Sequence, residues 1–209
     1  MIAIQEHPLL EAHCFITTLP KPLGELPTPE ELLSRLSAEY SSEFVRDDDL
    51  KQKVRQLLRH GGYRPSGRGK PASEYLAKAV PEGKLSSINL LVDLCNIASF
   101  HSGLPISVVD LDKTSYPLAI RLGTPDEEYI FNASGQTISL KGLICLCDEN
   151  GPCANAVKDS QRTKTSEATT RSLTIVWGSN DLPGLSSRVS QWYQAMLQEC
   201  GCSTETVTR

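Results

Sequence analysis

The chain has 209 residues, and 39% of them are hydrophobic, so it can bury a core of ordinary size. Its formal charge of −4 excludes a global positive field for nucleic acid, so any such binding needs a local patch. No apolar run of about 18 residues predicts a membrane-spanning helix, and the charged N-terminal segment is not typical of a signal peptide. Seven cysteines, mostly in apolar segments, favour reduced thiols in a cytoplasmic protein.

The N-terminal part predicts mainly helices. Residues 1–20 are compatible with a short strand, and a Pro-rich stretch follows. Thr28 before Pro29 predicts a helix start, and the helix is expected to run to about Tyr40. A second helix is expected from the acidic cluster at 47–49 to the glycines after His60. We therefore expect residues 1–63 to form a helical extension that packs on the core and is not a separate domain.

The longest helix is predicted between Ser87 and Ser102, after a shorter one that opens at Pro71. Because it is apolar on nearly every side, this helix should be buried. One polar stripe interrupts it, since Asn89, Asp93 and Asn96 are spaced i, i+4 and i+7 and share a face. The stripe is either a structural hydrogen-bond network or the wall of a site.

After the long helix the periodicity becomes strand-like. The predicted strands are 106–110, 118–122, 128–132, 138–147 and 173–177, and a closing amphipathic helix is predicted at 185–200. Helices first and strands later favour an α+β fold with mixed or antiparallel sheet layers and flanking helices. We expect the core domain to span residues 64–200 and residues 201–209 to form a flexible tail.

The strongest electrostatic feature is a basic stretch at residues 51–70. It holds seven Lys and Arg residues and no Asp or Glu. Its second half is a Gly-rich loop of the kind that can wrap phosphates, with Tyr63 available for stacking. The alternative is a solvated basic helix followed by a mobile loop.

Three other features are weaker candidates. The polar segment 155–165 joins two strands and is either a binding loop or a plain exposed loop. Cys145, Cys147 and Cys153 lack a nearby histidine and have no standard zinc spacing, so buried thiols are favoured over a metal site. His101 is expected to be a capping or core residue. We expect no cofactor and no metal.

The order of the motifs identifies a family resemblance. The segment Asn89-Leu-Leu-Val-Asp93-Leu-Cys-Asn96 is followed by Gly103-Leu-Pro105, Val109-Asp110-Leu-Asp112-Lys113 and Ile120-Arg121. This arrangement resembles the B3/B4 domain of the bacterial phenylalanyl-tRNA synthetase β subunit over about residues 64–180. In that synthetase the domain hydrolyses tyrosine wrongly attached to the phenylalanine tRNA. The chain lacks the other parts of a synthetase, so the resemblance implies a free-standing relative.

Two departures from the family pattern bear on activity. Ser107 stands where the family has a histidine, and a serine cannot do the proton transfer of an imidazole near neutral pH. Gln161 or Arg162 replaces the glutamate that recognises the tyrosine hydroxyl, so tyrosine specificity is not expected. No catalytic residue is therefore assigned. Asn89 and Asp93 are expected to be structural, with Asp93 tying the helix to the following turn, and Asn96 is placed at the pocket.

The resemblance implies an RNA-binding, editing-type domain with tRNA or aminoacyl-tRNA as partner, and with neither DNA nor a membrane. The residues expected to bind substrate are Asn96, Ser107, Asp159, Gln161, Arg162 and Thr163, and those expected to bind RNA are Arg59, Arg64, Arg68 and Lys70. Three hypotheses stay open: a trans-acting deacylase of mischarged tRNA, a non-catalytic tRNA-binding module, and an amino-acid-binding protein with Arg162 as carboxylate clamp.

Overall fold

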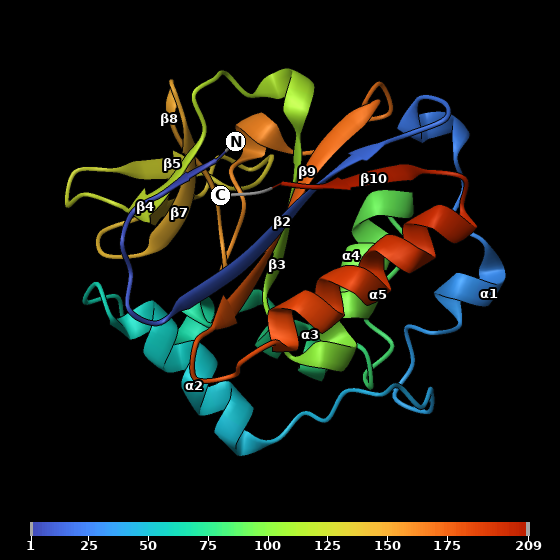
Figure 1. Ribbon diagram of the computed structural model, residues 1–209, viewed down its shortest axis with the longest axis horizontal. Helices are drawn as coiled ribbons and strands as arrows, with labels where there is room; N and C mark the ends of the chain where they lie inside the picture. Colours follow the sequence, from blue (N-terminus) through green and yellow to red (C-terminus); the bar gives the residue numbers. More distant parts are fainter. Residues whose placement is uncertain (1, 208–209) are drawn as a thin grey trace.

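The computed structural model describes residues 2–207 and shows an α+β fold built around two four-stranded sheets (Figure 1). The first sheet contains, in spatial order, β10 (Ser203–Thr206), β2 (Leu10–Thr18), β9 (Arg171–Ser179) and β3 (Ile106–Asp110). All neighbouring strands in it are antiparallel. The long strand β9 pairs along its whole length with β2 and also with β3, which makes it the centre of the fold.

Two helices cover one face of the first sheet. They are α4 (Leu90–Ser102), which contacts β3, and α5 (Leu185–Glu199), which contacts β2, β9 and β10. Figure 1 shows them next to each other, and the hydroxyl of Tyr193 on α5 donates a 2.7 Å hydrogen bond to the carbonyl of Leu91 on α4. Helix α4 ends where Gly103 adopts φ = 73°, a left-handed conformation that favours glycine.

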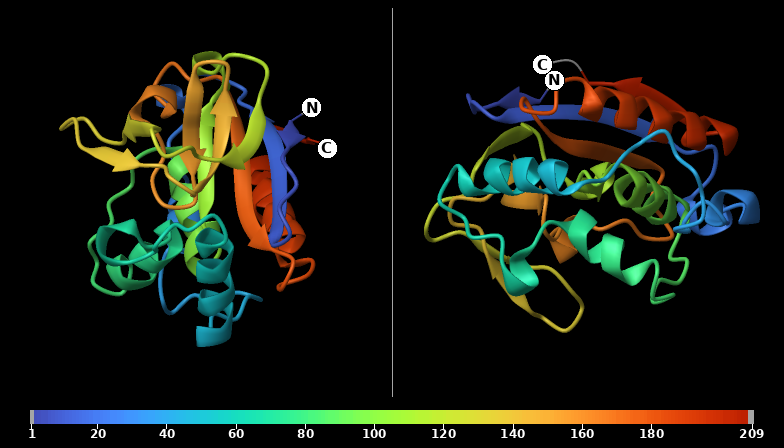
Figure 2. Two further views of the ribbon diagram at one scale, coloured as in Figure 1. Left: turned by 90° about the vertical axis from the view of Figure 1, so that its left-hand side faces the viewer. Right: turned by 90° about the horizontal axis from the view of Figure 1, so that it is seen from below.

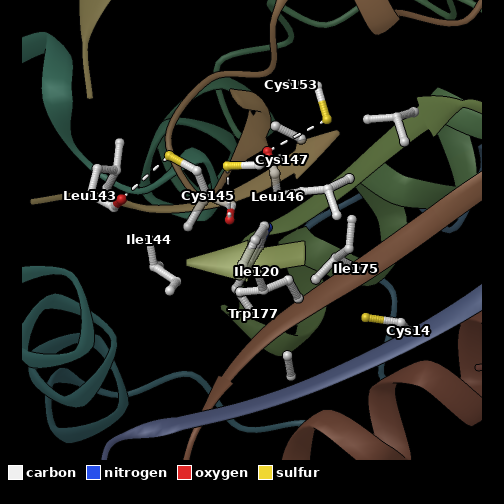
Figure 3. Packing of buried hydrophobic residues seen from close by; sticks show 14 of the residues in the cluster. Cys14, Ile120, Leu143, Ile144, Cys145, Leu146, Cys147, Cys153, Ile175 and Trp177 are labelled. Atoms are coloured by element: carbon white, nitrogen blue, oxygen red, sulfur yellow. Dashed lines mark hydrogen bonds between the residues drawn. The ribbon is translucent and has the colours of Figure 1, made fainter. Parts of the chain in front are cut away.

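The second sheet packs against the other face of the first. Its strands, in spatial order, are β1 (Ala3–Ile4), β4 (Ala119–Leu122), β7 (Ile144–Asp148) and β8 (Gly151–Asn155), and a hairpin of β5 (Glu128–Ile130) and β6 (Thr137–Ser139) extends from it. Figure 3 shows the shared core, in which Ile175 and Trp177 of β9 meet Ile120 of β4. Alternation along β9 explains the two cores, because Val176 points to the helical side instead.

Three shorter helices complete the fold. They are α1 (Glu30–Leu33), α2 (Asp48–Arg59) and α3 (Ala72–Ala79), with short 3-10 turns at Leu23–Glu25, Gly67–Gly69, Leu111–Lys113 and Gln161–Thr163. In the right-hand view of Figure 2, α1 lies at the right-hand end of the molecule, away from α2. A two-bond ion pair joins Arg55 of α2 to Glu74 of α3 at 2.6 and 2.7 Å. None of the helices in the described part of the chain is long and apolar enough to span a bilayer.

The structure confirms the α+β class and corrects several local predictions. The N-terminal region is not only helical, because its nine-residue strand β2 lies in the interior of the first sheet. The first helix is only four residues long. The predicted strand 138–147 is two strands, since Gly142 turns the chain with φ = 69° between β6 and β7.

The flexible tail predicted from residue 201 is also corrected. Ser203–Thr206 forms β10, whose backbone pairs with β2 and covers an edge that would otherwise expose unpaired peptide groups. The preceding Cys202 is buried. The end of the predicted tail, residues 208–209, lies outside the described residues. The predicted domain division at residue 64 stays a prediction.

Two residues of the polar stripe of α4, Asn89 and Asp93, have structural roles, as expected. Asn89 is the N-cap, and its side chain accepts the amide of Val92. Asp93 is 1% exposed and accepts hydrogen bonds from the hydroxyls of Thr28 and Ser87, both at 2.6 Å, and from the amide of Ile88 at 2.8 Å. Asp93 therefore ties the helix to the segment before it, not to the turn after it.

We expect Asp93→Ala to lower the free energy of unfolding by about 3 kcal/mol, because it removes three hydrogen bonds that a buried carboxylate accepts. Urea denaturation measures the change. Asp126→Ala is the control, since Asp126 is exposed, and it should change the value by less than about 0.5 kcal/mol. Equal stability of the two variants would refute the anchoring role.

Candidate functional site

A cavity of about 810 Å³ lies where α3 and α4 meet the loop after β8. The basic loop before α3 and the turn after β5 complete its wall. The residues that argue for a site are Arg68, Lys70, Tyr75, Lys78, Asn96, Phe131, Lys158, Asp159 and Lys164. Much of the remaining wall is apolar and includes Leu76, Val92 and Ile106. A mostly apolar pocket with a few convergent polar groups is the usual form of a ligand site.

Asn96 faces this cavity from α4. Its side chain is partly buried, and within residues 2–207 its amide has no hydrogen-bond partner. An amide has both donor and acceptor atoms, and a buried one normally uses them. The functional half of the polar stripe therefore offers a ligand two free hydrogen-bonding groups.

Asp159 lies on the loop after β8, and its carboxylate accepts hydrogen bonds from buried residues. Its Oδ1 accepts a 2.7 Å hydrogen bond from the hydroxyl of Ser107 and a 3.2 Å bond from the amide of Asn155, and the amide of Val108 also contributes. The Asn155 side chain fixes the loop itself, since its Oδ1 accepts the amides of Val157 and Lys158. The carboxylate is thus fixed in place at the cavity wall.

The charge of Asp159 is not neutralised by a neighbour. Across the described ranges, no Lys, Arg or His nitrogen lies within 4.0 Å of its carboxylate, and Lys164 acts on it only at longer range. Burial raises the pKa of Asp159 to about 6, and the hydrogen bond from Ser107 only partly offsets this effect. At neutral pH the cavity therefore contains an anion without a counter-ion.

Cations surround the cavity in excess. Arg68, Lys70, Lys78, Lys158 and Lys164 line it, and none of these five forms an ion pair with a carboxylate of the described chain. Burial and the charge of Arg68 lower the pKa of Lys158. The other carboxylate in the wall, Glu74, is already bound to Arg55. The site therefore favours a ligand that carries several negative charges.

Ser107 is placed beneath the cavity and does not line it. It is fully buried, accepts a 2.9 Å hydrogen bond from the indole N–H of Trp177 and donates to Asp159. Its hydroxyl therefore already accepts one hydrogen bond and donates another. The structure gives Ser107 the role of a support for Asp159, where the sequence analysis predicts contact with substrate.

The structure does not bring the three residues after Ser160 to the cavity wall. Gln161 is exposed, and Thr163 is buried with its hydroxyl bound to the carbonyl of Cys153 at 2.9 Å. Arg162 forms two hydrogen bonds of 2.8 and 2.9 Å with Asp148. Its guanidinium is already paired, so the predicted carboxylate clamp is not available.

The four predicted RNA-binding residues divide into two pairs. Arg68 and Lys70 line the cavity, whereas Arg59 and Arg64 are exposed outside it. Tyr63 does not offer a free ring, because it is half-buried and its hydroxyl donates to the carbonyl of Gly69 at 3.0 Å. Tyr63 instead braces the loop that carries Arg68 and Lys70.

Comparison with known proteins identifies the family. A model of the B3/4 domain matches residues 66–182, which is more than half of the chain. The chain belongs to the B3/4 domain family. The matched residues contain most of the cavity wall, and the match confirms the resemblance predicted from the sequence motifs. No curated protein matches the sequence.

Two solved structures show more distant similarity to this B3/4 domain protein. One is an N-terminal fragment of the phenylalanyl-tRNA synthetase β-subunit from Pyrococcus horikoshii, with 13% identity and a TM-score of 0.49, over 93% of this chain and 46% of the fragment. The chain thus spans about half the length of that fragment. The other is the TilS C-terminal domain, with 15% identity and a TM-score of 0.32, over 36% of this chain and 71% of that domain. The family assignment rests on the domain model.

Several site residues of the B3/4 domain have no signal that singles them out in the sequence. Tyr75 is 64% exposed at the cavity, and Ile88 is 66% exposed beside it. The ring of Phe131 packs under the ammonium of Lys158 at 3.9 Å, and the carbonyl of Phe131 accepts a 2.6 Å bond from Lys164. The lysines lie in the polar segment 155–165 that the sequence analysis selects, but only the fold shows that they meet Phe131.

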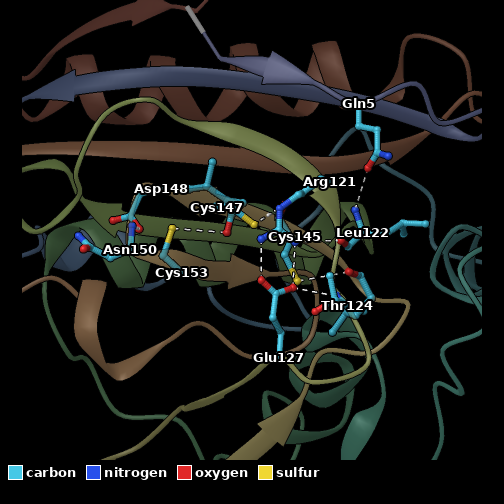
Figure 4. Close-up of polar contacts among 12 residues, drawn as sticks. Gln5, Arg121, Leu122, Thr124, Glu127, Cys145, Cys147, Asp148, Asn150 and Cys153 are labelled. Carbon is cyan, nitrogen blue, oxygen red and sulfur yellow. Dashed lines mark hydrogen bonds and ion pairs between the residues drawn. The ribbon is translucent and has the colours of Figure 1, made fainter.

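Cys95 is the one cysteine in the cavity wall among the described residues, and Cys153 lies behind the wall within electrostatic range of Asp159. Cys145, Cys147 and Cys153 are buried free thiols, as predicted, and burial raises the pKa of Cys147 to about 11. Figure 4 shows them beside the ion pair of Arg121 and Glu127, whose shortest distance is 2.6 Å. Within residues 2–207, no group of three or more His, Cys, Asp and Glu side chains is placed to hold a metal ion.

We expect Asp159→Asn to raise the free energy of unfolding at pH 7.5 by about 1–3 kcal/mol, because it removes a partly buried charge without a counter-ion. The pKa of Asp159 is about 6 in the folded state against 3.8 for a free side chain. The folded wild type therefore gains stability as the pH falls through 6 toward 4, and the advantage of the variant should shrink over that range. Lys164 is the charged group in reach, and the facing side chains of Cys95, Tyr129 and Cys153 stay neutral there because their pKa values are raised.

Urea denaturation of both proteins at pH 7.5 and pH 5 measures these differences. Asp126→Asn, in an exposed turn, is the matched control and should follow the wild type at both pH values. Destabilisation by Asp159→Asn at pH 7.5 would contradict the unpaired charge.

Proposed function

We propose that the cavity binds the aminoacylated end of tRNA. The observation that carries the proposal is the charge pattern of the wall. Five cations that form no ion pair surround one carboxylate that also forms none. An aminoacylated RNA end has the matching pattern, because it joins several phosphates to one ammonium group. Membership in the B3/4 domain family supports an RNA-related partner.

The wall offers a place for each part of such a ligand. Arg68 and Lys70, on the loop braced by Tyr63, are available for backbone phosphates. The exposed ring of Tyr75 is available for stacking with a terminal base. The apolar wall formed by Leu76, Val92 and Ile106 leaves room for an uncharged amino-acid side chain.

We further propose that bound aminoacyl-tRNA is hydrolysed. In this step water attacks the ester carbonyl, the bond to the ribose oxygen breaks, and the ribose hydroxyl and the free amino acid are released. The free amide of Asn96 supports the proposal, because its N–H can stabilise the negative charge that develops on the carbonyl oxygen. The buried, committed hydroxyl of Ser107 is not available as a nucleophile.

The other two hypotheses require different residues of the cavity wall. A free amino acid needs a partner for its carboxylate, and the ion pair between Arg162 and Asp148 removes the residue first proposed for that role. A non-catalytic tRNA-binding module needs the cations but not Asn96. The two experiments below therefore test binding and hydrolysis separately.

We expect tRNA binding to weaken steeply with salt, because each phosphate contact releases counter-ions. The double variant Arg68→Gln/Lys70→Gln should bind tRNA about tenfold more weakly at 0.1 M salt and show a shallower salt dependence by about 1–2 in the log–log slope. Lys21→Gln/Arg171→Gln is the control, since both cations are exposed and do not line the cavity. Fluorescence anisotropy with labelled tRNA measures both quantities. Identical behaviour of the two double variants would count against the proposed interface.

We expect the protein to release the amino acid from at least one member of a panel of mischarged tRNAs. Asn96→Ala should slow that release by about 10²-fold, because it removes the donor to the developing oxyanion, and should leave tRNA affinity within about twofold. Asn132→Ala is the control, since Asn132 also lines the cavity but its amide is already bound to Gln136. Release no faster than in buffer for every tRNA of the panel would leave the binding module as the function.

A further inference from the structure

We infer that Asp159 is the receptor for the α-ammonium group of the aminoacyl ligand, so that the site selects esters whose amino group is free and rejects N-acylated ones. The inference rests on the proposed function and deepens it, because it names the substrate class and the residue that selects it. Three features of the structure lead to it: the fixed position of the carboxylate, its missing counter-ion, and its surroundings.

The position of Asp159 is set by two sheets at once. Its Oδ1 is held at 2.7 Å by Ser107 on β3 of the first sheet, and Ser107 is held at 2.9 Å by Trp177 on β9. The loop that carries Asp159 follows β8 of the second sheet, where the side chain of Asn155 binds both the amide of Val157 and Tyr129. A carboxylate fixed in this way can recognise a ligand group with defined geometry, because little side-chain freedom is lost on binding.

The missing counter-ion indicates what the ligand must supply. Buried carboxylates are normally paired or accept hydrogen bonds to all their lone pairs. Asp159 accepts hydrogen bonds from the hydroxyl of Ser107 and the amide of Asn155, but no cationic nitrogen of the described chain lies within 4.0 Å of it. Five cations line the same cavity, but none forms an ion pair with the carboxylate, and Lys164 acts on it only at longer range. An ammonium group of the ligand would complete this site.

The surroundings of Asp159 favour an α-ammonium group over a cationic side chain. The wall of the same cavity includes the uncharged residues Val92, Cys95, Ile106 and Val157. Burial raises the pKa of Cys95, so its thiol stays neutral at physiological pH. An aminoacyl ester, the ligand of the proposed function, has one ammonium group beside an uncharged ester, and this matches one carboxylate in a largely apolar wall. An N-acyl group removes the positive charge and would leave the carboxylate unpaired.

Amino-acid amides test the inference without RNA and without hydrolysis. The probes are glycinamide, L-alaninamide, L-leucinamide and L-phenylalaninamide, each with its N-acetyl counterpart, titrated calorimetrically into the full chain at pH 7.5. We expect at least one free amide to bind at least tenfold more tightly than its N-acetyl form. Asp159→Asn should remove that preference, because it loses the affinity for the free amide and not the affinity for the acetylated one. Asp126→Asn, the matched surface variant, should keep it.

The outcomes separate this inference from the proposed function. Equal affinity for free and acetylated amides, unchanged selectivity in Asp159→Asn, or no binding of any amide would overturn the role of Asp159. Salt-dependent tRNA binding through Arg68 and Lys70 would then still support the proposed function. Selective amide binding without any tRNA binding would instead overturn the proposed function and leave an amine-binding site. The folded state of Asp159→Asn is verified by its unfolding curve.

Discussion

The hydrogen bond from Ser107 to Asp159 joins the two sheets at the point where the cavity lies. Ser107 belongs to β3, the edge strand beside β9, and Asp159 follows β8, the edge strand of the second sheet. Because the indole of Trp177 holds Ser107 from the other side, the geometry of the carboxylate is set by the buried core and not by the loop alone. Ser107, which the sequence resemblance aligns with a histidine, therefore holds Asp159 in position in this structure.

Positively and negatively charged side chains line one cavity of this protein without forming ion pairs with each other. The chain is acidic overall, with a formal charge of −4, yet five of its cations face one cavity without carboxylate partners. Such an arrangement is unfavourable in the free protein, since like charges repel and the partly buried Asp159 lacks a counter-ion. A fold under selection for stability alone would pair these groups with one another. Their separation is the arrangement that the proposed binding of a ligand with both charges requires.

Much of the fold follows from local sequence, because local rules decide those parts. The apolar pattern of α4, its N-cap at Asn89 and its glycine end were predictable, and so was the division of the polar stripe into structural and pocket-facing members. Strand β2 has the alternating pattern of a strand, but its place between β10 and β9 depends on partners far away in sequence. The fold accommodates Glu11 by a hydrogen bond from Ser186 of α5, a residue far away in sequence.

The site was predictable only where one segment carries the chemistry. Asn96 and Asp159 reach the cavity as the family resemblance implies, and Arg68 and Lys70 follow from the local basic pattern. The position of Arg162 was not predictable, because the β7–β8 hairpin brings its partner Asp148 to it. No local sequence pattern encodes this contact.

The most direct test of the account is a crystal structure with 3′-deoxy-3′-(L-leucylamino)adenosine, a stable analogue of an aminoacylated RNA end. We expect the α-ammonium nitrogen to lie within about 3 Å of the carboxylate of Asp159. We also expect the adenosine to lie toward Tyr75 and the basic loop. An analogue bound in the reverse orientation, or at another surface with the cavity empty, would contradict the account.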